Sequence, residues 1–311
     1  MKRKIPQKVQ EIRDYKLKQE AGSKNISFSQ LSTYLNCPKC WERSYLRKEM
    51  VYKPSIHATF GTAVHETLQT WLDILYNDSV KASNELDIND LLLQNLKKCY
   101  ASTKAQNGGV EFSSSKELQS FYEDGVAILD YVKKKRVATF PDRKVSWLVG
   151  CEIPLYVKLH EKFYFKGYID VLTYEEDRDI WKIWDIKTST SGWKDEKTDF
   201  VKTSQVILYK EFLHRMFDIP LEKIEIEYFI VKRKVLEEAE FASMKKRVQE
   251  FTPTCGSRNH KKAVEQISKF CSETLNEQGG YVDKSYTANP SQKNCKWCPY
   301  KETCAPSASV L

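Results

Sequence analysis

The sequence predicts an α/β (α+β) protein in which a central β-sheet is flanked by helices. Three observations lead to this expectation. Apolar side chains recur at helical spacing over residues 60–135, and runs rich in Val, Ile, Trp, Tyr and Phe are separated by polar turns over residues 146–188. Residues 222–234 alternate with the period of a strand. The 311 residues are enough for one large domain or two modest ones.

The elements are expected in a definite order along the chain. Residues 1–25 are charged and carry little apolar pattern, so they are interpreted as a flexible or peripheral basic arm. Regular structure is expected from residue 26, with Ser29 as the N-cap of a short helix. The chain then divides into an N-terminal helical segment at 26–59, a helical region at 60–140, a sheet-bearing core at 145–254 and a C-terminal segment at 255–311. Helices are expected at 61–75, 88–104, 116–137, 201–217 and 258–277, and strands at 146–159, 162–174, 180–188 and 222–234, the first three antiparallel.

Charge and cysteine content narrow the class of protein. The net charge of +8, from 50 basic and 42 acidic residues, is a mild excess that is compatible with a nucleic-acid partner. No run approaches the ~18 apolar residues of a membrane span, and the N-terminus lacks an apolar signal block, so a cytoplasmic protein without membrane contact is expected. Nine cysteines, an odd number, argue for metal binding or free thiols rather than a disulfide framework.

Two acidic residues fall on neighbouring strands of the predicted sheet. Asp185 and Lys187 are two positions apart in a strand, so they project to the same face. A hairpin that pairs Glu175 with Ile180 places Asp170 opposite Asp185, although a slip of one residue would separate the carboxylates onto opposite faces. Paired carboxylates of this kind bind hard cations such as Mg²⁺ or Mn²⁺.

The chemistry of such a site follows from its residue types. A bound divalent cation lowers the pKa of a water molecule and screens a phosphate oxygen. Lys187 could hold the attacking water or stabilise transition-state charge, and the carbonyl of Ile186 could supply a further ligand. The alternative is an ordinary exposed ion pair between Asp185 and Lys187.

Further residues along the chain complete a recognisable pattern. They are Gly61 and His65 (G-x3-H), Gly167 and Asp170 (G-x-x-D), Asp185 and Lys187 (D-x-K), and Gln205 and Tyr209 (Q-x3-Y). In this order they resemble the PD-(D/E)XK nuclease superfamily, specifically its RecB-like branch. The resemblance implies a restriction-endonuclease-like core with a mixed central sheet, flanking helices and a helical insertion. Without it, His65 would be interpreted as a core histidine, and Gln205 and Tyr209 as ordinary helix surface.

The resemblance also implies roles for these residues. His65, Asp170 and Asp185 would bind the metal, with Ile186 contributing its carbonyl, and Lys187 would support catalysis. Gln205 and Tyr209 would position the DNA. An imidazole ligand shifts the preference somewhat from Mg²⁺ toward Mn²⁺.

A second group of candidate ligands closes the chain. Cys295, Cys298 and Cys304 lie close together, and with Cys37 or Cys40 they would give four soft ligands suited to zinc or an iron–sulfur cluster. This arrangement resembles the iron–sulfur nucleases related to the CRISPR-associated prespacer-trimming enzyme and to AddB, which implies a four-iron four-sulfur lobe with Cys37 as the closer match. Zinc remains the alternative metal, and Cys40 the alternative ligand. The other cysteines are interpreted as ordinary thiols: Cys99, Cys151, Cys255 and Cys271.

These observations favour a metal-dependent DNA exonuclease or end-trimming enzyme, acting on single-stranded or frayed DNA in recombination, repair, CRISPR adaptation or phage DNA processing. No helicase motif is visible, so a helicase or integrase-type partner is expected to supply any motor. The alternatives are a non-catalytic DNA-binding module or subunit of a larger complex, and a small zinc-knuckle DNA-binding protein. Trp71, Tyr100 and Trp193 could stack on bases, with core packing as the other role open to them.

Overall fold

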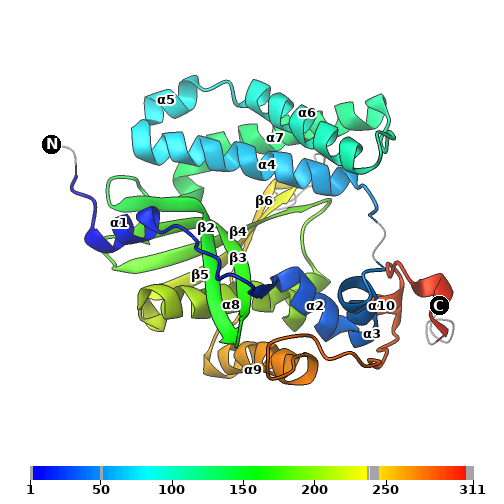
Figure 1. Cartoon of the computed structure of the whole chain (residues 1–311). Coiled ribbons are helices and arrows are strands. Elements are labelled where there is room, and N and C mark those ends of the chain that lie inside the picture. Colours follow the sequence, from blue (N-terminus) through cyan, green and yellow to red (C-terminus); the bar gives the residue numbers. More distant parts are fainter. Residues whose placement is uncertain (1–2, 50–51, 237, 239–244, 306–311) are drawn as a thin grey trace.

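The computed structural model describes residues 3–49, 52–236, 238 and 245–305, which place helices on both faces of a six-stranded mixed sheet (Figure 1). The strands are β1 (Lys24–Ile26), β2 (Ser146–His160), β3 (Phe163–Glu175), β4 (Ile180–Ser189), β5 (Ile224–Lys232) and β6 (Val248–Phe251). The helices are α1 (Gln7–Asp14), α2 (Phe28–Asn36), α3 (Pro38–Trp41), α4 (Ile56–Asp73), α5 (Val80–Glu85), α6 (Ile88–Gln106), α7 (Ser115–Thr139), α8 (Phe200–Phe217), α9 (Ser257–Thr274) and α10 (Gln292–Cys295). The predicted fold class is confirmed.

The sheet runs in the order β1-β3-β4-β5-β6, with β2 paired to β3. β2, β3 and β4 are antiparallel neighbours, as predicted, and the β3–β4 hairpin pairs Glu175 with Ile180 in the predicted register. β5 is parallel to β4, because the chain returns through α8 before it enters the sheet again. β1 is also parallel to β3, so the sheet has two parallel pairings among its antiparallel ones.

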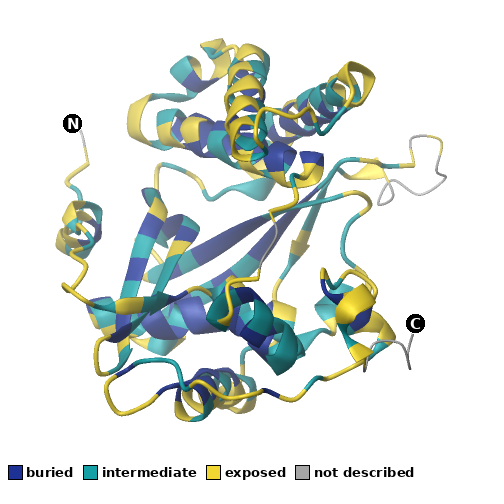
Figure 2. Ribbon diagram, turned by 45° about the vertical axis from the view of Figure 1, so that its right-hand side comes forward, coloured by how far each residue is buried: buried dark blue, intermediate teal, exposed yellow. Residues whose placement is uncertain are grey.

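Each face of the sheet buries its own apolar core. The period-2 alternation of β4 sends Trp181 and Ile183 to the side of α2, α8 and α9, and Trp184 and Ile186 to the side of α4, α6 and α7. Figure 2 shows the resulting three layers, with exposed residues on the outer helix surfaces. No helix in the described ranges combines the length and apolarity needed to cross a bilayer.

One edge of β3 is shared between two partners. β1 pairs with residues 163–165, and β4 pairs with residues 171–175. Within the described part of the chain, residues 166–170 have no strand partner on that edge. The last pair of the β3–β4 ladder is Val171 with Trp184. The two strands therefore separate at the position where Asp170 and Asp185 would otherwise face each other.

The N-terminal segment packs more closely than its composition suggests. The prediction of a flexible or peripheral arm at 1–25 is wrong in part, because Val9 and Ile12 of α1 are buried in the core and β1 extends the sheet. Two apolar residues three apart are too few to reveal a helix by periodicity. The predicted cap at Ser29 is also wrong: the N-cap of α2 is Ser27, whose hydroxyl accepts from the backbone N–H of Gln30.

Candidate active site

The two hairpin carboxylates lie where β3 and β4 separate. The backbone N–H of Ile186 donates to Asp170 Oδ2 at 2.7 Å. This side-chain bond takes the place of a ladder bond to the β3 backbone, so it satisfies a strand N–H that would otherwise lack an acceptor. The same bond holds the Asp170 carboxylate against β4, next to Asp185.

Asp185 is a buried carboxylate with one close partner among the described residues. It is 1% exposed, its Oδ1 lies 2.6 Å from Lys187 Nζ, and its Oδ2 has no hydrogen-bond donor among the described residues. Burial raises the pKa of Asp185, and Lys187 opposes that rise. Burial and the neighbouring Asp185 raise the pKa of Asp170 well above its usual range. The two carboxylates thus share one ammonium, so ionising both of them is unfavourable unless a further cation binds.

Helix α4 presents one row of residues to this site. Gly61, His65 and Gln69 are spaced four apart and share a helix face. A Cβ on Gly61 would lie 3.0 Å from Thr188 Oγ1, so the glycine lets the helix approach β4 closely. His65 Nδ1 lies 3.7 Å from Asp170 Oδ2. The G-x3-H pattern therefore has a physical cause, in which close helix–strand packing brings the imidazole to the carboxylate.

His65 is neutral at ordinary pH. Its pKa is lowered to about 4 by burial and by the Lys187 ammonium, against a smaller opposing effect of the Ile186 backbone. A neutral imidazole has a nitrogen lone pair available as a metal ligand.

The lysine of the site is held from the opposite side by α8. Lys187 Nζ donates to Gln205 Oε1 at 3.1 Å, and Gln205 Nε2 donates to the hydroxyl of Tyr209 at 3.0 Å. Burial lowers the pKa of Lys187, but Asp185 and Asp170 more than compensate, so its pKa is raised and it stays protonated. Tyr209 is only 5% exposed. The Q-x3-Y pair therefore contacts Lys187 through Gln205, which in turn is hydrogen-bonded to Tyr209.

Two residues of the site escaped the sequence analysis. Gln69 Nε2 donates to Glu152 Oε1 at 2.7 Å and to the backbone carbonyl of Asp170 at 3.0 Å. Glu152 adopts a positive φ of 53° on β2, and its charge adds to the rise in the pKa of Asp170. The four-residue spacing from His65 was a signal for Gln69. Nothing local in the sequence marks Glu152.

The donor set suits a hard divalent cation. Asp170 and Asp185 supply oxygens, His65 supplies a nitrogen, and the Asp185 Oδ2 without a donor is a buried acceptor that a cation would satisfy. No group of three or more His, Cys, Asp or Glu side chains in the described ranges stands in a metal-binding arrangement. At this site the Lys187 ammonium lies 2.6 Å from Asp185 Oδ1. The residues fit the cation once that ammonium moves aside.

Gly167→Ala should destabilise the protein, because the added Cβ would lie 2.8 Å from Phe165 Cε1 and 3.3 Å from Tyr209 Cε1. We expect a loss of about 1–3 kcal/mol in the free energy of unfolding, measured by urea denaturation. The control is Gly256→Ala, whose Cβ would have no heavy atom within 4 Å. Equal losses in the two variants would show that the approach of Tyr209 does not require this glycine.

Five of the nine cysteines lie together around one pocket. Cys37, Cys40, Cys295, Cys298 and Cys304 line one small pocket, which also includes Arg43 and Tyr300. Cys40 Sγ and Cys298 Sγ are 4.0 Å apart, across 258 positions of the chain. Burial and the neighbouring Cys298 raise the pKa of Cys40 to about 12. Both candidates for the fourth ligand thus share the pocket with the three tail thiols.

The remaining thiols match their predicted character. Cys99 and Cys271 are buried, whereas Cys151 and Cys255 are partly buried, and all of them are free.

Comparison with known families gives one result. The model of the family described as "PD-(D/E)XK nuclease superfamily" matches residues 25–305. The match therefore runs from β1 to the last of the tail cysteines, and includes every residue of the site described above. No curated protein matches the chain.

Proposed function

Because the chain belongs to the PD-(D/E)XK nuclease superfamily, we propose that it is a divalent-metal-dependent deoxyribonuclease that trims single-stranded or frayed DNA from an end. Members of this superfamily are generally nucleases that use Mg²⁺ or Mn²⁺. The observation that carries the proposal is the carboxylate pair Asp170 and Asp185, held in the gap between β3 and β4, where Lys187 is the one close cation among the described residues.

The proposed ligands follow from this geometry. Asp170 and Asp185 would hold the cation, with His65 and the carbonyl of Ile186 completing the protein's share. When bound, the cation would act as a Lewis acid on a phosphate oxygen and would favour ionisation of water. The Ile186 N–H fixes the orientation of the Asp170 carboxylate. A divalent cation would let both carboxylates ionise, which their mutual repulsion otherwise opposes.

Lys187 is proposed as the catalytic cation of the protein itself. Its ammonium is protonated and partly exposed, so it would donate a hydrogen bond to the phosphate where negative charge develops. Gln205 and Tyr209 are proposed as positioning residues, because they contact Lys187 directly and in series. Gln69 and Glu152 are proposed to position the strand segment that carries Asp170.

The tail cysteines are proposed to bind a second, non-catalytic metal centre. A four-iron four-sulfur cluster on Cys37, Cys295, Cys298 and Cys304 is the preferred form, and zinc is the alternative. The shared pocket and the soft donor set support a metal there. Cys40 competes with Cys37 as a ligand, since its sulfur lies 4.0 Å from that of Cys298.

A comparison of linear and circular single-stranded DNA tests the proposed activity. Protein purified without air should degrade the linear form with Mn²⁺ or Mg²⁺ and be inactive with a chelator, while the circle should survive because it has no end. Gel electrophoresis of end-labelled and internally labelled substrates gives the readout. Cleavage of the circle at the same rate would indicate an endonuclease instead. No cleavage of either form would favour a non-catalytic subunit that works with a helicase or integrase-type partner.

A further inference from the structure

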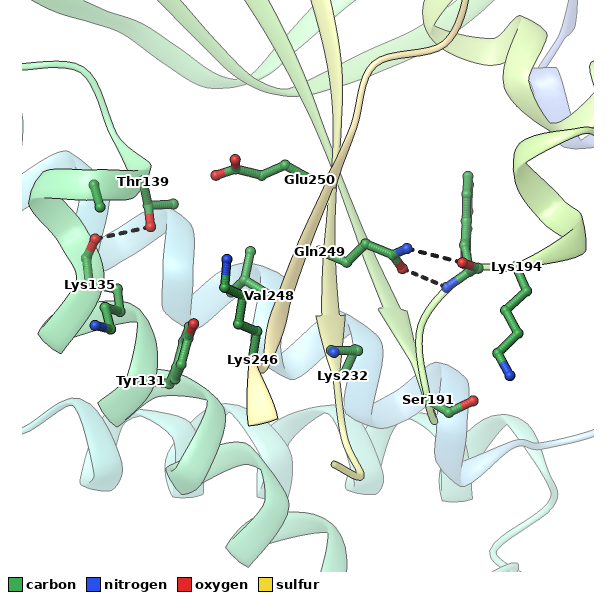
Figure 3. Close-up of a pocket in the computed structure, with 12 residues that line it drawn as sticks. Tyr131, Lys135, Thr139, Ser191, Lys194, Lys232, Lys246, Val248, Gln249 and Glu250 are labelled. Carbon is green, nitrogen blue, oxygen red and sulfur yellow. Dashed lines mark hydrogen bonds between the residues drawn. The ribbon is translucent and has the colours of Figure 1, made fainter. Parts of the chain in front are cut away.

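A pocket of about 600 Å³ opens where the carboxyl ends of β4 and β5 meet α7 and β6 (Figure 3). Four lysines from four different elements line it. Lys135 comes from α7, Lys194 from the segment after β4, Lys232 from the end of β5, and Lys246 from the segment before β6. Four ammonium groups that are far apart in the sequence therefore lie around one cavity. The ends of β4 and β5 are also where open α/β sheets commonly bind ligands.

The described residues offer these lysines few counterions. Among the described residues, none of the four forms an ion pair, whereas the neighbouring Arg233 and Lys234 both pair with Asp124 of α7. The basic run at 232–234 is thus divided: Arg233 and Lys234 share the Asp124 carboxylate, whereas Lys232 lines the pocket. Burial, with Arg247 and Lys246 nearby, lowers the pKa of Lys232, as expected where like charges crowd together.

One carboxylate also lines the pocket. Glu250 lies on β6, and its pKa is raised by burial and by Glu227, against the effect of Lys182 and Lys246. In Figure 3 its side chain extends from β6 on the side opposite Gln249. Among the described residues that line the pocket, one glutamate faces four lysines, so the described lining is positive and suits an anionic ligand.

The wall of the pocket is rigid and partly aromatic. Gln249 clamps the backbone of Trp193: it accepts from the Trp193 N–H at 2.7 Å and donates to the Trp193 carbonyl at 3.0 Å. Gly192 permits this with a φ of 98°, where an added Cβ would lie 2.8 Å from the Gln249 amide oxygen. Trp193 packs on Tyr228 at 4.8 Å between ring centroids, and Tyr131 borders the pocket from α7. Of the three aromatic residues considered for base stacking, Trp71 is wholly buried and Tyr100 stacks on Phe112.

The pocket and the proposed active site share a strand. Ser189 follows Asp185 by four positions on β4, which is about 13 Å at roughly 3.3 Å per residue, and the even spacing puts both on one face. Ser189 is paired in register with Lys232 of β5. A ligand that reaches from Asp185 along this face of β4 therefore arrives at Lys232, and the pocket continues past the strand ends to Lys135 of α7.

We propose that this pocket binds the sugar–phosphate backbone of single-stranded DNA beside the scissile position, with lysines on the phosphates and Trp193 available to a base. Cations combined with an aromatic side chain, here the partly exposed Trp193, are the features by which proteins hold single strands without reading sequence. The inference rests on the proposed function for its choice of ligand. It identifies a substrate-holding site separate from the residues of the Asp170–Asp185 pair.

Binding measured without catalysis tests the pocket. Fluorescence anisotropy of a labelled single-stranded oligonucleotide is recorded in a chelator over a series of KCl concentrations, with wild type, the double variant Lys135→Ala/Lys246→Ala and the single variant Lys232→Ala. The double variant should bind roughly tenfold more weakly, and its log–log salt slope should fall by about 1.4, since each lost phosphate contact removes about 0.7. Lys135 and Lys246 are both exposed, so their removal leaves the cores intact.

The matched control is Lys81→Ala/Lys261→Ala, which removes the same net charge from α5 and α9, where each lysine has a glutamate partner. The control should keep the wild-type slope. Equal salt slopes in the pocket and control variants would overturn the inference. So would a pocket variant that binds DNA like the wild type but no longer binds an acidic peptide. Because no cleavage is measured, an inactive wild type would contradict the proposed function alone, and an unchanged slope would contradict the pocket alone.

Discussion

Asp185→Asn is expected to abolish metal-dependent DNA cleavage, with a loss of at least about 10²–10³-fold in rate. The asparagine keeps the shape of the side chain but removes half of the negative charge that Asp170 and Asp185 present. It also replaces one carboxylate oxygen of residue 185 with an amide NH2 group, which donates hydrogen bonds and cannot serve as a metal ligand. Cleavage of a linear single strand at saturating Mn²⁺, by wild type and variant, measures the effect.

A second readout separates metal binding from turnover. A cation that binds only the folded protein stabilises it by about 2.7 kcal/mol at a concentration of 100 times its Kd. Mn²⁺ should therefore raise the melting temperature of the wild type and leave that of Asp185→Asn unchanged. In a chelator the variant should be at least as stable as the wild type, because burial raises the pKa of Asp185 and makes its ionised form costly to fold.

Asp179→Asn is the control for this substitution. Asp179 lies in the turn of the same hairpin, its side chain is 58% exposed, and its positive φ suits asparagine. It should keep both the activity and the Mn²⁺ response. Equal cleavage by Asp185→Asn and wild type would contradict the catalytic assignment, and an equal rise in melting temperature would contradict the metal assignment.

Cys298→Ser is expected to remove the proposed second metal centre and to destabilise the whole chain. The centre would join residues 258 positions apart, and a cross-link over so long a loop contributes on the order of 4–5 kcal/mol by restricting the unfolded chain. Anaerobically purified wild type should show visible absorption and bound iron, and the variant should have neither. Its urea midpoint should fall accordingly.

Two comparisons sharpen this result. Cys37→Ser and Cys40→Ser, measured in the same way, identify the fourth ligand as the one whose loss removes the absorption. Cys255→Ser should leave the metal content unchanged, because that thiol is only partly buried and lies outside the pocket. A colourless wild type with one zinc per chain would replace the cluster with a zinc site. A wild type without any metal, as stable as Cys298→Ser, would exclude a metal centre in this lobe.

The sequence by itself determined the features that depend on local spacing. Alternation along 180–188 separates the faces of β4, and the polar stretch between Glu175 and Ile180 sets the hairpin register, so Asp170 and Asp185 could be brought together from the residues alone. Helical spacing likewise puts Gln205 and Tyr209 on one face of α8. These inferences succeed because periods of 2 and 3.6 residues are properties of the backbone and not of its surroundings.

Only the tertiary structure decided how distant segments meet. The edge of β3 is shared by β1 and β4, and this opens the gap that holds the carboxylates. Lys187 contacts both Asp185 and Gln205, so the Q-x3-Y pair lies beside the lysine and not on an open helix surface. The partnership of Glu152 with Gln69 depends on a strained backbone position, and the lysine pocket depends on four segments separated by up to about a hundred residues. Such contacts follow from the path of the chain between them, which short sequence periods do not encode.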